Sequence, residues 1–563
     1  MRKVKFMSLG GQDELGKSMY CVEINDHIFL LDAGYRFPES EKLGVDIIIP
    51  GYQYLKDNSD RISAIFITHG HDDVMGGLPY FLAEVQGVPV YSPSLTADFI
   101  EQMIERYERH NRVDLHLNLT RVKRDSSVDI DGVHIEFFPI THSIPGSIGV
   151  ALKSDEGYIV YGSEYIIDFG AELGFRSNIQ KMMEIGKSGV LALMLESSYS
   201  RKPGYTSPKH RLTGKIDRFF EEATGRIIIS SYAQNVYRTK EIIELTKKYG
   251  RKIVFYGRDK YDKTNTMLRA DKKHRLPVID LDDCMIGDKE NIGIPAKDRN
   301  YVILLSGAPH AIYNDISDIL DGGDELLKIR QGDTFIVASP VLPGTERIAN
   351  KAINDLYRTE AKIVVLKNSD LTSMHASQED IKVMMQIFKP KYYIPIKGEY
   401  QQLITNSHVA YDMGIDDDHV IILDNGERIT FDDGVLEPEK ELFEIDNVMV
   451  DGIGIGDVGE KVIDDRIQLA NDGVVVVGVT IDAYTKKIIA QTDCQTRGFI
   501  YLKDSAYIVK EIIRICEEVI GQLEDDPYMD LNAVRNMMRE QSIRYIVKET
   551  GKRPVFLAVI VEV

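Results

Sequence analysis

The 563-residue sequence has few cysteines and no long apolar run. Its four cysteines, Cys21, Cys284, Cys494 and Cys516, lie far apart and form no CxxC pair. This spacing argues against a disulfide framework and a thiolate zinc site, and it favours a reducing cytoplasm. Because no stretch of about 20 apolar residues exists, we expect no membrane span. The N-terminus also lacks the apolar run and cleavage site of a signal peptide.

Basic residues are outnumbered by acidic ones, and the formal net charge is −20. A chain of this charge is not coated with nucleic acid, but a local groove stays compatible with it, since steering depends on where charges lie. Basic residues do cluster between about positions 201 and 260, for example Arg201, Lys215 and Arg238. A set of solvated helix faces is the simplest interpretation of this cluster when it is taken alone.

The chain is too long for one hydrophobic core, and its length predicts roughly three or four domains. Residues 1–200 have the short β-branched runs and turn residues of successive strands. Residues 206–365 alternate between helical and strand patterns, which indicates a parallel-sheet α/β insert. The glycine-rich stretch 451–459 predicts a linker, and a separate C-terminal module with two helices follows it. The final segment PVFLAVIVEV is so apolar that we expect it to be buried in a sheet or an interface.

The sequence from Thr68 to Val74, THGHDDV, nearly matches a loop that holds two metal ions. His69 and His71 follow the strand-like segment AIFIT, where a loop can turn two imidazoles toward one point. A complete HxHxDH loop would place a third histidine at position 74, which is Val74 here. The same seven residues therefore predict a metallohydrolase and a damaged metal site.

Two further strand ends carry residues of the same kinds. ITHS places His142 after a strand, and YGSEYIID places Glu164 and Asp168 after the next one. Imidazole nitrogens and carboxylate oxygens are the usual protein ligands of divalent transition metals. Three such strand ends in one region indicate a metal centre more strongly than any one of them.

These motifs together resemble bacterial ribonuclease J, over essentially the whole chain and in the family's order. Within the family, the sequence is most similar to the second, degenerate paralogue that occurs beside a fully active one. The motifs that carry the resemblance are THGHDDVMGG, PITHSIP, the Glu164 strand, SSYAQNVYR, SPVLPGTE, SMHASQED, KPKYYIPIKGEY and VDGIGIGDVG.

The resemblance implies an α/β protein: a metallo-β-lactamase αββα sandwich with an inserted β-CASP α/β domain and a small C-terminal α/β domain. We expect the sandwich at 1–205 and 369–445, and the β-CASP domain at 206–368. A linker is expected at 446–460 and an oligomerisation domain at 461–563.

By resemblance, one metal ion would be bound by His69, His71, His142 and Glu164. Glu164 replaces the family's bridging aspartate, and an alternative alignment would place Ser163 there, although spacing favours Glu164. The second ion would use Asp73, Glu164 and the positions of Val74 and Lys397. Val74 has no donor atom, and Lys397 must lose a proton to coordinate an ion. We therefore expect one weak divalent site, for Zn or Mn, or none. A further hypothesis is that the Lys397 ammonium occupies the second ion's place.

The resemblance also assigns residues to RNA. The family's HVSGH loop corresponds to Leu371, Thr372, Ser373, Met374 and His375, of which His375 would contact the scissile phosphate or protonate the leaving oxygen. Asp73 is the other candidate catalytic residue.

Two further segments complete the implied site. Glu196 would support His375 or His142 by a hydrogen bond. Ser231, Tyr232 and Asn235 lie in a strand-to-helix loop suited to a phosphate, with Tyr232 stacking on a base. The segment 306–310 replaces the family's glycine- and glutamate-rich loop.

Two functions of different classes remain open. In the first, the chain is a ribonuclease of weakened 5′→3′ exonuclease or endonuclease activity, acting in rRNA maturation and mRNA decay. In the second, it is a non-catalytic RNA-binding subunit that assembles with an active ribonuclease J paralogue. Self-association is expected from the C-terminal region in both cases. A small-molecule hydrolase fits less well, because the insert and the C-terminal module cover more than half the chain.

Overall fold

The computed structural model describes residues 3–38, 45–257, 300–308, 311–342, 345–451, 454–455, 460–500, 506–522 and 530–563. The chain divides into two compact units. One comprises Met1–Ser40 and Ile47–Val448, and the other comprises Glu41–Asp46 and Met449–Val563.

The larger unit contains a mixed sheet in the order β20-β19-β1-β2-β3-β5-β6-β7, with β21 paired to β19. β3, β5, β6 and β7 run parallel, whereas β1 pairs antiparallel with β2 and with β19. The strands are β1 (Lys3–Gly10), β2 (Met19–Ile24), β3 (His27–Leu31), β5 (Ile62–Phe66), β6 (Val90–Pro93), β7 (Leu119–Val122), β19 (Glu427–Asp432), β20 (Val435–Leu436) and β21 (Glu441–Leu442).

A second sheet has the order β18-β12-β11-β10-β9-β8. Its strands are β8 (Ser127–Ile130), β9 (Val133–Pro139), β10 (Ile148–Ser154), β11 (Gly157–Tyr161), β12 (Val190–Glu196) and β18 (Tyr392–Ile396). β18 pairs parallel with β12, so a segment close to residue 400 completes a sheet begun before residue 200.

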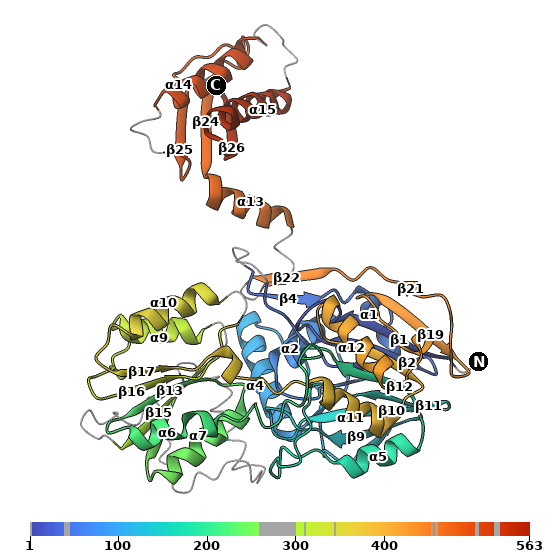
Figure 1. Ribbon diagram of the computed structural model, residues 1–563. Helices are drawn as coiled ribbons and strands as arrows, with labels where there is room; N and C mark the ends of the chain where they lie inside the picture. The colour runs from blue at the N-terminus through green and yellow to red at the C-terminus, as the bar shows by residue number, and fades with distance from the viewer. Residues whose placement is uncertain are drawn as a thin grey trace. The chain divides into compact units, whose positions relative to one another are not determined.

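The two sheets share one apolar core. Phe29 and Phe66 of the first sheet lie in the same buried cluster as Phe137 and Tyr161 of the second. A second cluster buries the outer face of the second sheet under α5 (Ile179–Lys187), α11 (Gln378–Phe388) and α12 (Tyr400–Asp412). α4 (Ser94–Asn111) packs on β6 and β7 of the first sheet. These layers confirm the predicted αββα sandwich, which is visible in the lower right of Figure 1.

The insert is a five-stranded sheet in the order β14-β15-β13-β16-β17, and all its neighbouring strands run parallel. Figure 1 shows α9 and α10 on one face and α6 and α7 on the other. This confirms the predicted parallel α/β insert. The elements are α6 (Thr213–Glu222), β13 (Ile227–Tyr232), α7 (Val236–Lys248), β14 (Lys252–Gly257), β15 (Tyr301–Gly307), α9 (Ile312–Leu320), β16 (Thr334–Val337), α10 (Glu346–Leu356) and β17 (Lys362–Val365).

The smaller unit contains a three-stranded sheet, β25-β24-β26, packed on two helices. Val475, Val477 and Val479 of β24 alternate into a core that includes Ile512 and Met538. The elements are α13 (Glu460–Asp472), β24 (Val474–Ile481), β25 (Asp493–Arg497), α14 (Ala506–Gly521), α15 (Leu531–Thr550) and β26 (Val555–Glu562).

The last strand, β26, is buried on one face only. Phe556 and Ile560 lie in the core, whereas Leu557, Val559 and Val561 are exposed. The predicted segment is therefore in a sheet, and burial of its other face at an interface stays a prediction.

The remaining elements are short. They are β4 (Ile47–Pro50), α1 (Gln53–Asp57), α2 (Asp72–Met75), α3 (Leu78–Glu84), β22 (Asn447–Asp451), β23 (Gly454–Ile455) and three 3₁₀ turns at Ser59–Arg61, Asn368–Asp370 and Asp417–His419. The predicted linker at 446–460 contains β22 and lies partly outside the described residues. Among the residues described, no helix combines the length and the apolar character needed to cross a bilayer.

Candidate metal centre

The histidine loop lies between β5 and α2, and backbone hydrogen bonds to other segments hold it in place. Ser18 N donates to Asp73 O at 3.0 Å, and Ala33 N donates to Val74 O at 2.7 Å. Gly34 lies so close that a Cβ there would stand 1.7 Å from Asp73 O. A side chain at position 34 would therefore push the loop away, and the glycine of the segment LDAG is a packing requirement of the site.

Four side chains from three strand ends converge at this loop. The ligand atoms of His69, His71, His142 and Glu164 all lie within 4.8 Å of one another. His69 and His71 follow β5, His142 follows β9, and Glu164 follows β11. The structure thus brings together the four residues predicted to bind the first ion, and places the alternative, Ser163, elsewhere: its hydroxyl bonds Thr68 Oγ1 at 2.7 Å.

The spacing of these atoms fits one tetrahedral ion. Glu164 Oε2 lies 3.5 Å from His69 Nε2, 3.5 Å from His71 Nδ1 and 3.1 Å from His142 Nε2. His142 Nε2 and His71 Nδ1 are 3.3 Å apart. A tetrahedron with metal–ligand bonds of about 2.0–2.1 Å has edges of roughly 3.3–3.4 Å. The buried His69 Nε2 has no hydrogen-bond partner in the described structure, as expected of an atom reserved for an ion.

The opposite nitrogen of each imidazole is held by a neighbour. His69 Nδ1 lies 3.1 Å from Thr68 Oγ1, and His71 Nε2 lies 2.8 Å from Ser143 Oγ. His142 Nδ1 donates to the Met374 carbonyl at 2.8 Å, which leaves its Nε2 with a free lone pair. Contacts of this kind fix the ring orientation and the tautomer of metal-binding histidines.

The electrostatics favour neutral imidazoles. Burial, together with the neighbouring imidazoles, holds the pKa of His69 and His142 well below the usual value. Neutral histidine is the form that coordinates metal ions. The donor set therefore fits a divalent ion in number, spacing and protonation.

The other oxygen of Glu164 faces a different group. Lys397 Nζ contacts Glu164 Oε1 and lies 2.7 Å from Asp73 Oδ2. Burial disfavours the Asp73 anion, but the Lys397 charge and hydrogen bond outweigh it and hold the Asp73 pKa below its usual value. Lys397 is buried in the left-handed conformation, with φ of 52°, and Val74 is buried beside Asp73 in α2. Asp73 thus bonds an ammonium, and Val74 offers no donor.

His375 stands at the edge of the cluster. Its Nδ1 lies 2.7 Å from Glu196 Oε2 and 3.8 Å from Glu164 Oε2. Although burial opposes the charged imidazole, the Glu196 carboxylate raises the pKa of His375 to about 9. Glu196 also accepts from Ala376 N and Tyr165 N. Of the two histidines that Glu196 was predicted to support, it contacts His375, whose ring can therefore donate a proton.

The strand-to-helix loop after β13 differs from the prediction. Tyr232 is only 7% exposed, its ring packs in the insert core, and its hydroxyl donates to Pro340 O. Its ring cannot stack on a base in this conformation, because it is buried in the core of the insert. The Asn235 side chain accepts from Arg238 N and caps α7, while Ser231 is buried with an unpaired hydroxyl in the described structure.

The segment 371–374 is fixed to the site by its backbone. Leu371 and Met374 are buried, so their side chains do not line a substrate path. Thr372 O accepts from Arg238 Nη2 at 3.0 Å, and Ser373 N donates to Tyr199 OH at 3.2 Å. Part of the 306–310 segment, Pro309 and His310, lies outside the described residues.

Several residues of the centre carried little or no signal in sequence. Asp32 accepts from Thr68 N, Thr68 Oγ1 and Tyr161 OH beneath the histidine loop, and burial raises its pKa to about 7. The Tyr199 ring lies 5.3 Å from the His375 ring, and Gln234 donates to Asp72. A polar residue directly after the apolar run HIFLL was the one available sign of Asp32. The others are placed by long-range contacts.

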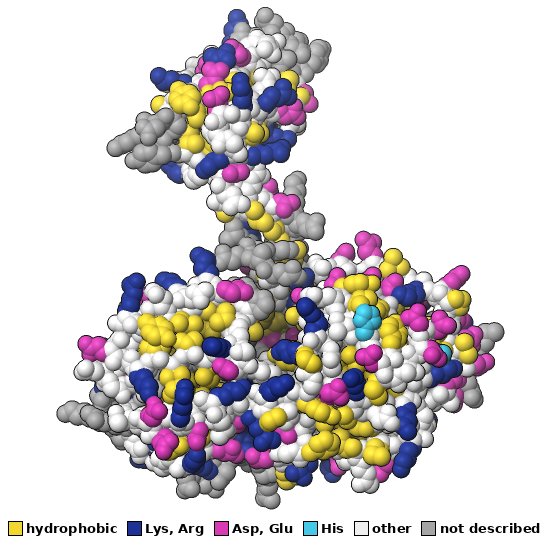
Figure 2. Space-filling view, in the orientation of Figure 1, with side chains coloured by type: hydrophobic (Ala, Val, Ile, Leu, Met, Phe, Trp, Pro, Cys, Tyr) yellow, Lys and Arg dark blue, Asp and Glu magenta, His cyan; other side chains and the backbone are white. Residues whose placement is uncertain are grey.

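Part of the basic cluster is paired with acids. Arg226 pairs with Asp333, and Lys248 pairs with the exposed Asp217. Figure 2 shows Lys and Arg mixed with Asp and Glu on the visible face of the larger unit. Solvated or paired helix faces therefore describe part of this cluster, and buried Arg238 contacts the loop of His375 through the Thr372 carbonyl.

Three family models match successive parts of the chain. A model described as Beta-lactamase superfamily domain matches residues 29–167. One described as Ribonuclease J, beta-CASP domain matches residues 224–356, and one described as Ribonuclease J C-terminal domain matches residues 461–563.

Curated proteins match over the full length. The chain is 30% identical over 561 residues to Ribonuclease J2 of Bacillus subtilis (strain 168), with 100% of this chain and 99% of that protein covered. It is 31% identical over 563 residues to Ribonuclease J 2 of Staphylococcus saprophyticus, with the same coverage. A crystal structure of a protein of unknown function from Enterococcus faecalis V583 aligns with a TM-score of 0.52 at 14% identity, over 76% of this chain and 100% of that chain. At that identity, the likeness shows the fold alone.

Proposed function

The chain belongs to the ribonuclease J family, and on that premise we propose that it is a metal-dependent ribonuclease with weakened activity. It would cleave RNA 5′→3′ as an exonuclease, or internally as an endonuclease, in rRNA maturation and mRNA decay. The observation that carries the proposal is the set of four donor atoms around one point, with His375 beside it.

One ion is proposed, Zn or Mn, held by His69, His71, His142 and Glu164. Three imidazole nitrogens and one carboxylate suit zinc in particular. A divalent ion there supplies Lewis-acid chemistry for phosphodiester hydrolysis. Loss of a second ion removes several kcal/mol of transition-state stabilisation, which supports weakened activity rather than none.

The remaining groups have separate roles in this proposal. The protonated His375 hydrogen-bonds the scissile phosphate or gives its proton to the leaving oxygen, and Glu196 keeps it charged and oriented. Lys397 neutralises Asp73 and Glu164 where a second cation would otherwise do so. Asp73 then acts through Lys397 and positions its ammonium.

Substrate contacts are proposed along the surface near His375. Tyr199 carries the Lys202 ammonium 3.0 Å from its ring centre, and it holds the backbone of Ser373. Thr372, Ser373 and His375, which are partly exposed, are the members of the predicted loop that RNA can reach. Backbone groups and the hydroxyl of Ser231 remain proposed phosphate contacts, whereas Tyr232 is not.

The test is cleavage of a 5′-monophosphorylated RNA by the purified protein with Mn²⁺ or Mg²⁺, beside a His69→Ala/His71→Ala chain. Activity in the wild-type chain that is lost in the double variant supports a working single-ion centre. Equal traces in both chains, or none in either, contradict it. Measuring bound metal in the same samples separates a loss of the ion from a loss of folding.

A second candidate function is a non-catalytic, RNA-binding subunit of a complex with an active ribonuclease J paralogue. Two observations favour it: the missing donors at Val74 and Lys397, and the exposed apolar face of β26. That face would be buried against a second copy or a paralogue.

Assembly can be tested in the full chain. Leu557→Lys/Val559→Lys should lower the mass measured by light scattering, alone and after mixing with the paralogue. Tyr507→Lys, which changes an exposed residue of α14 in the same unit, is the matched control. An unchanged mass in the double variant contradicts this role for the face.

A further inference from the structure

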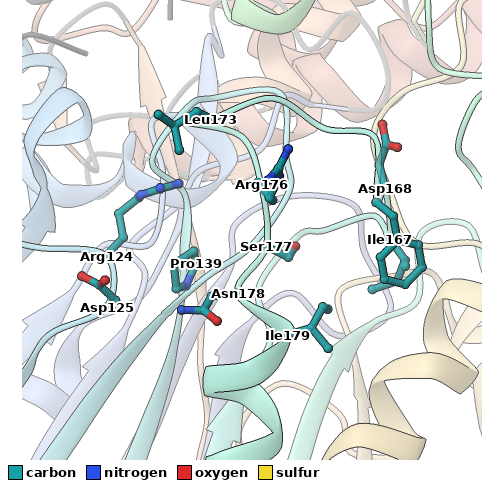
Figure 3. Close-up of a pocket in the computed structure, with 11 residues that line it drawn as sticks. Arg124, Asp125, Pro139, Ile167, Asp168, Leu173, Arg176, Ser177, Asn178 and Ile179 are labelled. Carbon is teal, nitrogen blue, oxygen red and sulfur yellow. The ribbon is translucent and has the colours of Figure 1, made fainter. Parts of the chain in front are cut away.

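A pocket of about 520 Å³ lies on the sandwich beside the loop that follows β11. In Figure 3, Arg124 and Asp168 stand at opposite sides of it, with Arg176 and Ser177 between them. Phe169 and Leu173 of the same loop also line the pocket. Asp168 was considered above as a strand-end acid of the metal centre, and the sequence motifs assigned no function to the other residues named here.

The pocket contains two arginines without an acid partner, of which Arg124 is half-buried and Arg176 is exposed. Arg124 Nη1 donates to Gly174 O at 2.9 Å, and Arg176 Nε donates to Ala171 O at 3.0 Å. Each guanidinium is therefore held in place by a carbonyl and keeps further N–H groups for another acceptor. Within the described ranges, neither forms an ion pair. A half-buried cation without a counter-charge is costly, and a bound anion offsets that cost.

The acids of the pocket do not fill this role. Asp168 is engaged by Arg211 Nη2 at 3.0 Å and by Gly170 N at 3.0 Å. Asp125 is exposed, and its charge acts on Arg124 without an ion pair. The lining therefore favours one small anionic group near the two arginines over a ligand with several charges.

The rim of the pocket is apolar and accessible. Phe169 is 76% exposed and Leu173 is 66% exposed. An exposed aromatic ring that lines the same pocket as two guanidinium groups is a stacking surface for a planar heterocycle, as in proteins that bind single-stranded nucleic acids. The pocket thus pairs an anion site with a site for a flat ring.

We infer that this pocket binds a phosphorylated nucleoside, with the phosphate between Arg124 and Arg176 and the base against Phe169. Its source is either a free nucleotide or one nucleotide of an RNA strand, because both present the same chemistry. The inference rests on the proposed function only where RNA is the source.

The pocket lies along the same two strand ends that carry His142 and Glu164. Pro139 and Ile167 line the pocket, and each lies three residues from a predicted metal ligand, His142 and Glu164. Thr141 connects the two places: its hydroxyl bonds Ser177 Oγ at 2.9 Å, and its carbonyl accepts from Ile166 N at 2.9 Å. A nucleotide in the pocket would therefore lie against the two strand ends that carry His142 and Glu164.

The test is equilibrium dialysis of radiolabelled 5′-AMP against the full-length His69→Ala/His71→Ala chain, so that the metal centre takes no part. We expect one site per chain. Arg124→Gln or Arg176→Gln should weaken binding about tenfold or more, as loss of a charge-assisted hydrogen bond does. Phe169→Ala should weaken it about fivefold or more. Lys123→Gln removes the same charge from an exposed neighbour outside the pocket and should change nothing.

Two further arms complete the design. Adenosine should bind at least tenfold more weakly than 5′-AMP, because it lacks the phosphate. An RNA decamer that displaces 5′-AMP and binds at least tenfold more tightly identifies RNA as the source, and equal or weaker binding identifies the free nucleotide. The wild-type chain treated with EDTA repeats each arm in case the double variant is unfolded.

No saturable 5′-AMP binding at millimolar concentration, or binding that both arginine variants leave unchanged, overturns the inference. Cleavage is measured separately. An inactive chain that still binds 5′-AMP contradicts the proposed function alone, and an active chain that does not bind it contradicts this inference alone.

Discussion

The two sides of the Glu164 carboxylate meet different surroundings. Oε2 faces three imidazole nitrogens at 3.1–3.5 Å, whereas Oε1 contacts the ammonium of Lys397. The imidazoles at Oε2 are donors that can bind a metal ion, whereas Oε1 already has a cationic side chain as its partner. A lysine side chain is part of the protein, so a chelator cannot remove it as it removes a bound metal ion. The comparison shows two ways in which a predicted ligand position can differ: Lys397 brings a positive charge, and Val74 brings no donor atom.

Rebuilding the second side should have the largest effect. Val74→His/Lys397→His supplies two donors and removes the ammonium beside Asp73. We expect bound metal to rise from one to two ions per chain, and cleavage to rise by about a thousandfold or more. Elemental analysis and RNA cleavage rates measure the two effects.

The single variants are the controls for this experiment. Val74→His alone keeps the Lys397 charge and should still bind one ion. A double variant that folds, as judged by thermal melting, and still binds one ion would show that the two sides differ in more than these two residues.

Removing the ammonium alone should destabilise the protein. Lys397→Met leaves the buried Glu164 and the half-buried Asp73 without their cation, and loss of one partner from a buried pair such as Lys397–Glu164 costs about 3–5 kcal/mol. Denaturant unfolding without metal measures this loss. Added Mn²⁺ should reverse part of it by taking the ammonium's place.

Lys362→Met is the matched control, since it breaks an exposed pair with Glu222 and should leave the free energy of unfolding nearly unchanged. Equal losses in the two lysine variants would mean that the Lys397 contact is not a structural ion pair.

The proton donor should matter for rate and not for metal. His375→Gln removes the imidazolium held by Glu196, and we expect cleavage to fall about a hundredfold or more. Bound metal, measured by elemental analysis, should stay at the wild-type level. His110→Gln, on the exposed face of α4, is the control. A parallel loss of metal in His375→Gln would place His375 among the ligands.

The smallest effect is expected from the support of a ligand. Ser143→Ala removes the hydroxyl 2.8 Å from His71 Nε2 and should weaken metal binding about tenfold. Competition with a chelating dye measures this affinity. Ser147→Ala is the control, because the Ser147 hydroxyl donates to the Ile144 carbonyl and makes no hydrogen bond to a histidine of the metal centre in the described structure. Unchanged affinity in Ser143→Ala would mean that the hydroxyl does not orient the ring.

Much of the sandwich and insert could be predicted because their signals are local. Segments such as RIIISSY and KIVFYG form the strands β13 and β14 where their composition indicates, and His69 and His71 lie at a strand end. The convergence of His142 and Glu164 with them followed from the order of strand ends.

Other parts depend on contacts that no local pattern reports. Lys397 and Asp73 meet across 324 positions, so sequence suggested only a lost ligand and a hypothesis about its charge. Tyr232 was assigned to RNA because aromatic residues stack on bases, but packing of the insert core decides its burial. Asp32 is recognisable only through its bonds to Thr68 and Tyr161.

The groups on the two sides of Glu164 are far apart in sequence, so they are synthesised at different times. His69, His71, His142 and Glu164 all lie in the first 164 residues, whereas Lys397 follows the whole insert. At about 5–20 residues per second, a ribosome needs on the order of ten seconds or more to pass from one to the other. The nascent sandwich therefore exposes its acids first and gains its own cation last. Before Lys397 is synthesised, a metal ion from solution can pair with these carboxylates. In the complete chain, Lys397 contacts them.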